Sequence, residues 1–213
     1  MNRKNSWWAI ATAVFILLWS PQDVALGING DQERQEIAHL AELTHWKAAT
    51  IVADVGAGDG TYSWVVAQKV GPSGRVYATE IDTEKLKLLR AEAAKRKLDN
   101  ITVVEGTVDD TRLPSSCCDT IFLRHVYHHL TQPQEFDKNL VRSLRPGAYL
   151  AIIDFPPSPN SSLPEGVPAN RGGHGIPEKV MEQELTTAGL QVEKVIDDWS
   201  AQDYCVIFVK RSL

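Results

Sequence analysis

The stretch IVADVGAGDGTYS, residues 51–63, limits the fold more than any other part of the sequence. A short apolar run contains an acidic residue, and glycines then follow at three alternate positions, Gly56, Gly58 and Gly60. Glycine adopts turn conformations that other residues avoid, and it leaves the backbone bare. The stretch therefore predicts a strand, a tight turn that can lie against a ligand, and then a helix over 62–70.

The alternation of apolar runs with helical patterns continues along most of the chain. The runs predict strands at 51–54, 75–82, 101–106, 120–124 and 148–154. The helices expected between them and before the first strand are 32–46, 62–70, 83–98 and 134–144. A helix at 177–188 and two strands at 190–197 and 203–210 follow. This order predicts an α/β fold with a doubly wound, mostly parallel seven-stranded sheet that ends in an antiparallel C-terminal hairpin.

Charge and cysteine content narrow the partners that the chain can have. Its 27 acidic and 22 basic residues give a net charge of -5, so we expect no broad basic surface and no nucleic-acid partner. A small-molecule substrate is expected instead. The three cysteines, Cys117, Cys118 and Cys205, contain no C-x-x-C pair and leave an odd thiol, so the sequence predicts neither a disulfide framework nor a zinc ribbon.

The N-terminal segment differs in composition from the rest of the chain. Arg3 and Lys4 precede an uncharged, mostly apolar run at 7–19, and small residues follow it. This order is typical of a cleaved signal peptide at 1–27, which would deliver the domain at 28–213 to a periplasmic or secretory compartment. The alternatives are a retained membrane anchor, a helix that packs on the domain and a helix that lies at the membrane surface. At ~1.5 Å per residue the run covers about 20 Å, which is less than the ~30 Å hydrocarbon layer, so a spanning helix would need help from its flanks.

The spacing of the glycines limits the ligand. A dinucleotide motif, G-x-G-x-x-G, would need a third glycine where Thr61 stands, and a P-loop would need a lysine. The remaining pattern, DVGAGDG with Asp54 free for a cationic amino group, resembles the first motif of the class I SAM-dependent methyltransferases. The resemblance covers about 36–210 and implies a Rossmann-like fold, S-adenosylmethionine (SAM) as cofactor and methyl transfer to a small molecule.

The same resemblance implies where the ribose and the adenine of the cofactor bind. In the family an acidic residue at the end of the second strand bonds both ribose hydroxyls, and Glu80 matches it, with Ile81 beside it. Two carboxylate oxygens suit a vicinal diol. At the adenine site many relatives carry G-D-A, whereas this chain has Thr107. Either Asp109 or Asp110 substitutes there, or both are turn residues.

The segment IFLRHVYHHLTQP, 121–133, resembles the fourth-strand motif of the ubiquinone and menaquinone C-methyltransferase-like branch. The resemblance implies that Arg124 and His125 lie at the strand end beside the methionine part of the cofactor. If the chain is helical from there, His125 shares a face with His128 and His129, and one of the three can act as a general base for the acceptor. We favour His128 or His129. The alternative is that the pair only orients this turn.

A metal site in this segment is not expected. A zinc protease motif would need Glu where Val126 stands, no cysteine cluster accompanies the histidines, and His174 and Asp154 are the only obvious extra ligands. The Pro- and Gly-rich segment 155–175 predicts a lid over the carboxyl ends of the strands or a disordered loop, with Arg171 and His174 near the pocket.

The function expected from these features is transfer of a methyl group from SAM to a small-molecule acceptor by in-line displacement. An exported or membrane-attached binding module with the same fold and no turnover is the alternative. An NAD-linked oxidoreductase is disfavoured by Thr61.

Overall fold

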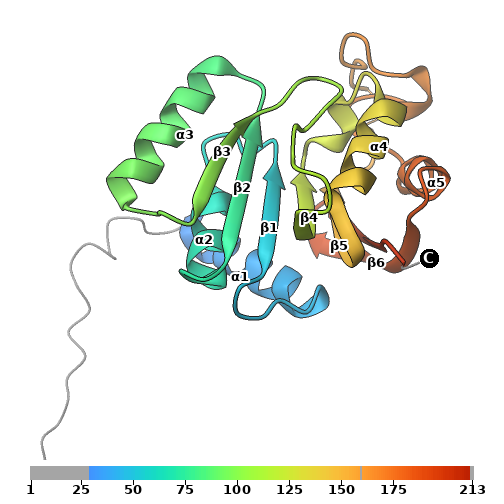
Figure 1. The fold of residues 1–213 in the computed structure, drawn as a ribbon. Helices are drawn as coiled ribbons and strands as arrows, with labels where there is room; N and C mark the ends of the chain where they lie inside the picture. The colour runs from blue at the N-terminus through green and yellow to red at the C-terminus, as the bar shows by residue number, and fades with distance from the viewer. Residues whose placement is uncertain (1–28, 159, 212–213) are drawn as a thin grey trace, which may run out of the picture.

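One mixed sheet forms the centre of the computed structural model, which describes residues 29–158 and 160–211. Within these residues seven strands lie in the order β3-β2-β1-β4-β5-β7-β6 (Figure 1). Their bounds are β1 Ile51–Val55, β2 Arg75–Glu80, β3 Ile101–Glu105, β4 Cys118–Arg124, β5 Leu144–Asp154, β6 Gln191–Ser200 and β7 Asp203–Val209. The first five strands pair in parallel, and β7 is antiparallel to both β5 and β6. The predicted fold class is confirmed.

Helices cover both faces of this sheet (Figure 1). The α-helices of the described part of the chain are α1 Asn29–Leu43, α2 Thr61–Val70, α3 Thr83–Arg96, α4 Pro133–Ser143 and α5 Glu178–Thr187. Two short 3-10 turns are η1 Tyr127–His129 and η2 Ala169–Arg171. Apolar residues of α1 and α2 form one core with the sheet, and those of α4 and α5 form another. Along β4, Phe122 joins the first core, whereas its neighbours Ile121 and Leu123 join the second. A strand buried on both faces reads as a continuous apolar run, as this one does.

The order in which the chain adds strands to the sheet determines where a ligand site can form. From β1 the chain adds β2 and β3 toward one edge, and it then returns to add β4 and β5 on the other side of β1. The strand order therefore reverses between β1 and β4, where Val55 pairs with Leu123 near both carboxyl ends. Open α/β sheets bind ligands at such a reversal, because the loops that leave the two strands diverge there.

Three local features differ from the sequence predictions. The RPG sequence at 145–147, predicted to stop a helix before the strand, lies inside β5, which pairs with β4 from Leu144 onward through an irregular register. His125 has a φ of 56° and interrupts the helix expected from that residue, so only 127–129 form a helical turn. The apolar run at 7–19 lies outside the described residues. Between residues 29 and 211, none of the described helices has the length and apolar character that a membrane crossing requires.

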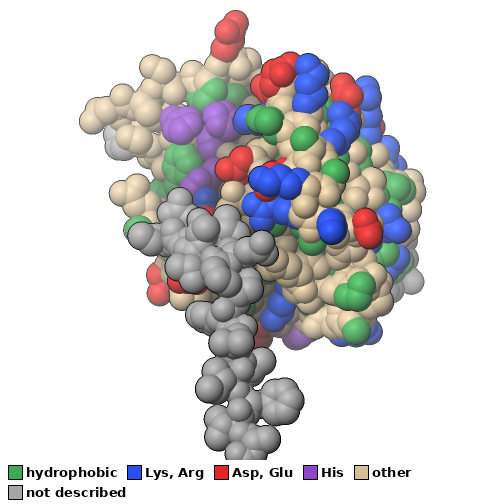
Figure 2. Space-filling model, turned by 90° about the vertical axis from the view of Figure 1, so that its left-hand side faces the viewer, with side chains coloured by type: hydrophobic (Ala, Val, Ile, Leu, Met, Phe, Trp, Pro, Cys, Tyr) green, Lys and Arg blue, Asp and Glu red, His purple; other side chains and the backbone are tan. Residues whose placement is uncertain are grey.

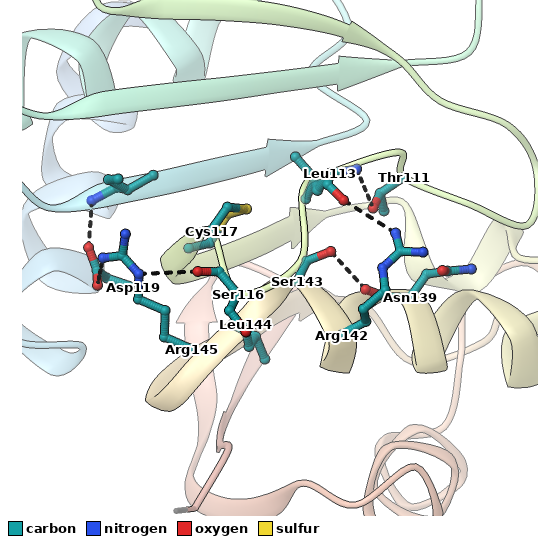
Figure 3. The surroundings of a disulfide bond; sticks show 12 residues. Thr111, Leu113, Ser116, Cys117, Asp119, Asn139, Arg142, Ser143, Leu144 and Arg145 are labelled. Carbon is teal, nitrogen blue, oxygen red and sulfur yellow. Dashed lines mark hydrogen bonds and ion pairs between the residues drawn. A yellow bond between two sulfur atoms is a disulfide. The ribbon is translucent and has the colours of Figure 1, made fainter.

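A disulfide joins the neighbouring residues Cys117 and Cys118 at the start of β4 (Figure 3). Both residues are buried, and Cys205 is a buried free thiol on β7. The sequence prediction missed the disulfide, because spacing rules for separated cysteines say nothing about adjacent ones. Asp119, next to the disulfide on β4, connects this strand to β5 and β1. Its carboxylate accepts hydrogen bonds from Arg145 Nη1 at 2.6 Å and from the backbone N–H of Ile51 at 2.8 Å.

Candidate functional site

A cavity of about 510 Å³ opens at the reversal of the strand order. Loops after β1, β2, β3 and β4 and the residues of η1 and α4 form its wall. Eight of the site residues predicted from the sequence line it: Gly56, Gly58, Glu80, Ile81, Thr107, Arg124, His125 and His129. Four do not line it: Asp54, Gly60, Asp109 and His128. The structure thus brings together residues that lie up to 73 positions apart in the sequence, from Gly56 to His129.

The three glycines of the first turn have different roles. All have positive φ, at 76° for Gly56, 58° for Gly58 and 84° for Gly60. A Cβ on Gly56 would lie 2.5 Å from Val126, and one on Gly60 would lie 2.2 Å from Trp64, so these two permit close packing of protein against protein. A Cβ on Gly58 would meet no atom within 4 Å. Only Gly58 therefore presents bare backbone to open space, at the wall of the cavity.

Glu80 ends β2 with its carboxylate held by backbone amides. Oε1 accepts from the N–H groups of Ile81 at 2.8 Å and Asp82 at 3.1 Å, and Oε2 accepts from Gly58 at 3.0 Å. A carboxylate has about four acceptor positions, so these three bonds leave about one free, on Oε2. The side chain is fixed in place, and it can accept one hydroxyl hydrogen bond without losing an amide. The sequence pattern gave no sign of this restriction.

Asp54 lies beneath the glycine turn and is bonded within the protein. Its Oδ2 accepts a hydrogen bond of 2.6 Å from Ser63 Oγ on α2. Burial raises the pKa of Asp54 to about 7, and the Ser63 hydrogen bond opposes this change. The carboxyl group is 4% exposed and does not line the cavity, so its contact with a cationic amino group stays a prediction.

The loop after β3 has the hydrogen bonds of a tight turn. Thr107 Oγ1 donates to Asp109 Oδ1 at 2.7 Å and accepts from the backbone N–H of Asp110 at 3.1 Å. Asp110 Oδ1 in turn accepts from the backbone N–H of Arg112 at 2.7 Å. Of the three predicted adenine contacts, only Thr107 lines the cavity, beside the exposed side chain of Val108. The geometry matches the alternative that the two aspartates are turn residues.

Arg124 at the end of β4 joins three distant parts of the chain. Its guanidinium donates to Glu36 Oε2 on α1 at 3.0 Å and to Asp203 Oδ2 on β7 at 3.2 Å. Burial alone would raise the pKa of Glu36, but hydrogen bonds and the charge of Arg124, with further bonds from Gln32 and Trp199, hold it below its usual value. Glu36 and Asp203 were not predicted as site residues. Both lie far from Arg124 in the sequence, so no local pattern indicates that they pair with it.

His125 belongs to this ion-pair network and not to the other histidines. Its Nε2 lies 2.9 Å from Asp203 Oδ1, and its Nδ1 lies 3.2 Å from Arg124 Nη1. The expectation that His125 shares a helical face with His128 and His129 is wrong. His125 has a left-handed backbone conformation and lies before the helical turn, which contains only 127–129. Both of its ring nitrogens have protein partners in the structure.

His128, His129 and His174 form a separate cluster, and Figure 2 shows histidine side chains close together on one face of the molecule. His128 is 1% exposed; its Nδ1 lies 2.8 Å from Asp154 Oδ1, and its Nε2 lies 3.2 Å from His174 Nε2. His129 is exposed and is the member that lines the cavity. Partial burial and the neighbouring imidazoles lower the pKa of His129, against the opposing charge of Asp154.

The segment predicted as a lid folds back on itself beside the histidines. Its ends are joined by a hydrogen bond from the backbone N–H of Ile176 to Phe155 O at 3.0 Å, and Ser158 N–H donates to His174 O at 3.1 Å. Among its described residues none lines the cavity. Arg171 is fully buried and donates to Glu184 Oε2 at 2.8 Å, so it lies away from the pocket that the sequence suggested for it.

Comparisons with known proteins agree with this geometry. Residues 53–152 match the family described as "Methyltransferase domain". The ubiquinone/menaquinone biosynthesis C-methyltransferase of Pseudomonas paraeruginosa is 26% identical over 123 residues, which are 57% of this chain and 48% of that protein. The demethylmenaquinone methyltransferase of Listeria monocytogenes is 25% identical over 53% of this chain and 48% of its own length. The matched region thus spans about half the length of these curated relatives.

Solved structures extend the similarity to nearly the whole chain. A SAM-dependent methyltransferase from Aquifex aeolicus is 27% identical, with a TM-score of 0.71 over 90% of this chain and 99% of that one. An S-adenosylmethionine-dependent methyltransferase from Clostridium acetobutylicum, 10% identical with a TM-score of 0.68 over 89% of this chain and 95% of that one, shares the fold alone. By its matched domain, its sheet order and these neighbours, the chain is similar to the class I SAM-dependent methyltransferases.

Proposed function

We propose that the protein transfers the methyl group of SAM to a small-molecule acceptor. The observation that carries this proposal is that one cavity is lined by the bare turn at Gly58 and the fixed carboxylate of Glu80, from the ends of β1 and β2, and by the imidazole of His129, from η1. A cofactor and an acceptor that meet in one cavity need such a division, with polar groups that hold the cofactor apart from groups that face the acceptor.

The residues at the glycine turn fit the nucleoside part of the cofactor. Gly58 leaves space for a ligand against the backbone, and Glu80 keeps about one acceptor position for a ribose hydroxyl. Thr107 and Val108 line the wall next to them, where an adenine ring would lie. When bound, SAM supplies a methyl group on a positively charged sulfur. The sulfur leaves as a neutral thioether when an acceptor atom bonds to the methyl carbon.

The protein's task at the other end of the cavity is to align the acceptor and exclude water. Leu130 and Phe136 give that part of the wall an apolar surface, and His129 places a polar group within it. Because the curated relatives are named for quinone methylation, a hydroxylated aromatic ring is the first acceptor class to test.

The test is isothermal titration of the full chain with SAM, followed by mass spectrometry of products from a panel of quinols, phenols and thiols. We expect binding below millimolar concentration and one methylated product class. Absence of binding at millimolar SAM would contradict the proposal. Binding without any methylated product across the panel would favour the binding module that the sequence leaves open.

A further inference from the structure

Three imidazoles converge outside the part of the cavity that the cofactor is proposed to occupy. His128 and His129 come from η1, and His174 comes from the segment that precedes α5. One ring nitrogen of each lies within 4.8 Å of one nitrogen of each of the others. Three histidines from two segments, with ring nitrogens this close together, are the ligand set of many transition-metal sites.

The deepest of the three histidines is oriented by a buried carboxylate. Asp154, which is fully buried at the end of β5, accepts from the backbone N–H groups of His128 at 3.2 Å and Phe155 at 3.0 Å. Its oxygens therefore act as acceptors, and His128 Nδ1, at 2.8 Å, donates to it. This leaves the lone pair of His128 Nε2 directed at the cluster. A metal-binding histidine is commonly held by a carboxylate on its other nitrogen in this way.

The spacing within the cluster also suits a metal ion. Zinc binds imidazole nitrogen at about 2.0 to 2.1 Å in tetrahedral geometry, which places two ligand nitrogens about 3.3 Å apart. His128 Nε2 and His174 Nε2 are 3.2 Å apart. The nitrogen of His129 lies within 4.8 Å of both, so its exposed ring has to move closer to complete the set. A hydrogen bond between two neutral imidazoles explains the first pair, but it does not explain why a third ring faces them.

We propose that His128, His129 and His174 bind a divalent transition-metal ion such as Zn²⁺. Three protein ligands leave at least one coordination position for water or a substrate atom. His129 borders both the cluster and the cavity, so that open position lies next to the acceptor end. A hydroxyl or thiol of the acceptor that coordinates there would give up its proton to solvent and present an anionic oxygen or sulfur to the methyl group. This last step rests on the proposed function, whereas metal binding does not.

The test uses the full chain without an affinity tag, stripped with a chelator, incubated with Zn²⁺ and passed through gel filtration. Metal analysis is expected to find about one zinc per chain in the wild type. His174→Ala should retain less than a tenth of that amount. The matched control is His39→Ala, because His39 is an exposed histidine that stacks on Trp199 at 4.7 Å and does not belong to the cluster. It should retain the wild-type amount. Equal retention in the wild type and His174→Ala, at any level, would overturn the proposal.

Two further measurements separate misfolding and failure of the proposed function from failure of the metal site. Titration with SAM should give the same affinity for His174→Ala as for the wild type, because His174 does not line the cavity. Cobalt(II) substitution should give visible absorption bands of a four- or five-coordinate ion in the wild type and not in His174→Ala. If no form binds SAM but zinc retention still depends on His174, the metal site stands and the methyltransferase proposal fails. Loss of SAM binding in the variant alone would assign His174 a structural role and overturn the metal proposal.

Discussion

Gly58 and Glu80 line the same cavity, one by lacking a side chain and the other by providing a fixed carboxylate. Gly58 contributes by lacking a side chain, since its φ of 58° and its open surroundings are compatible with a ligand against the backbone. Glu80 contributes a carboxylate whose position is set by three amides, one of them from Gly58 itself. The turn and the acid are therefore one unit, and a change in either should alter ligand binding more than folding.

Replacement of Gly58 by Ala is expected to weaken SAM binding at least tenfold. The new Cβ would occupy the space that the ligand needs, and the left-handed backbone would add roughly 1–2 kcal/mol of strain to the folded state. Gly71→Ala is the matched control, because Gly71 has a φ of 69°, meets no atom within 4 Å of its added Cβ and does not line the cavity. Titration calorimetry and thermal unfolding of both variants measure the two effects. Equal affinities in the two variants would place the cofactor elsewhere.

Replacement of Glu80 by Gln should cost about 1.5 to 3 kcal/mol of SAM binding, the usual size of a hydrogen bond to a charged group. The amide nitrogen of Gln cannot accept a hydroxyl, and it would also face one of the backbone N–H groups that the carboxylate now satisfies. The control is Glu105→Gln, which makes the same change at the residue of β3 that pairs with Glu80 and has an exposed side chain. That control should bind SAM as the wild type does. The prediction fails if both variants bind with the same affinity.

At the scale of single residues, the sequence predicted positions better than partners. The glycines and Glu80 follow one another closely along β1, α2 and β2, so local spacing is enough to place Gly56, Gly58 and Glu80 at one cavity, although Gly60 does not line it. His125 was misplaced because its ring is held by Asp203, 78 residues further along the chain. The pairing of His174 with His128 depends on a segment that returns to η1 after 46 positions. Local patterns carry no information about contacts of this range.

At the scale of elements, the contact between β1 and α2 includes a buried carboxyl group. Asp54 on β1 accepts the hydroxyl of Ser63 on α2, and both side chains are shielded from water. The alternation of strands and helices was predictable, because the spacing of apolar residues differs between strands and helices and can be read within each segment. The protonation of a group at their interface was not, because it depends on the depth at which the two elements meet.

The stability contributed by Asp54 should fall as the pH rises. Its pKa is about 7 in the folded state against a usual value of 3.8, so between these values the folded state holds a proton that the unfolded state has released. The free energy of unfolding therefore decreases through this window and levels off above pH 7. Asp54→Asn keeps an acceptor for Ser63 and removes the titration.

Urea unfolding at pH 4.5 and pH 8 measures this effect. The stability of Asp54→Asn relative to the wild type should be higher at pH 8 than at pH 4.5, by an amount on the order of 1 to 4 kcal/mol. Asp99→Asn changes an exposed carboxylate on a loop and should show no such pH dependence. A relative stability of Asp54→Asn that is the same at both pH values would show that Asp54 is ionised in the folded state at both.

At the scale of the whole molecule, the N-terminal sequence and the cofactor point to different compartments. The segment 1–27 predicts export, whereas SAM is made in the cytosol. A disulfide between Cys117 and Cys118 is favoured by an oxidising compartment, where an exported domain would lie. We propose on the basis of the N-terminal sequence that the chain is exported or attached to a membrane.

The number of reactive thiols can test this proposal together with the disulfide. We expect the full chain, produced in a cell that exports it and purified without reductant, to start after residue 27 and to alkylate at one cysteine when denatured. That cysteine should be Cys205, because Cys117 and Cys118 are joined. Prior reduction should raise the number to three. A chain that starts at residue 28 and stays in the cytosol is the control, and it should alkylate at three cysteines without reduction. Three reactive thiols in a chain that has lost its N-terminal segment would contradict the disulfide, whereas an intact N-terminus in the cytosolic fraction would contradict export.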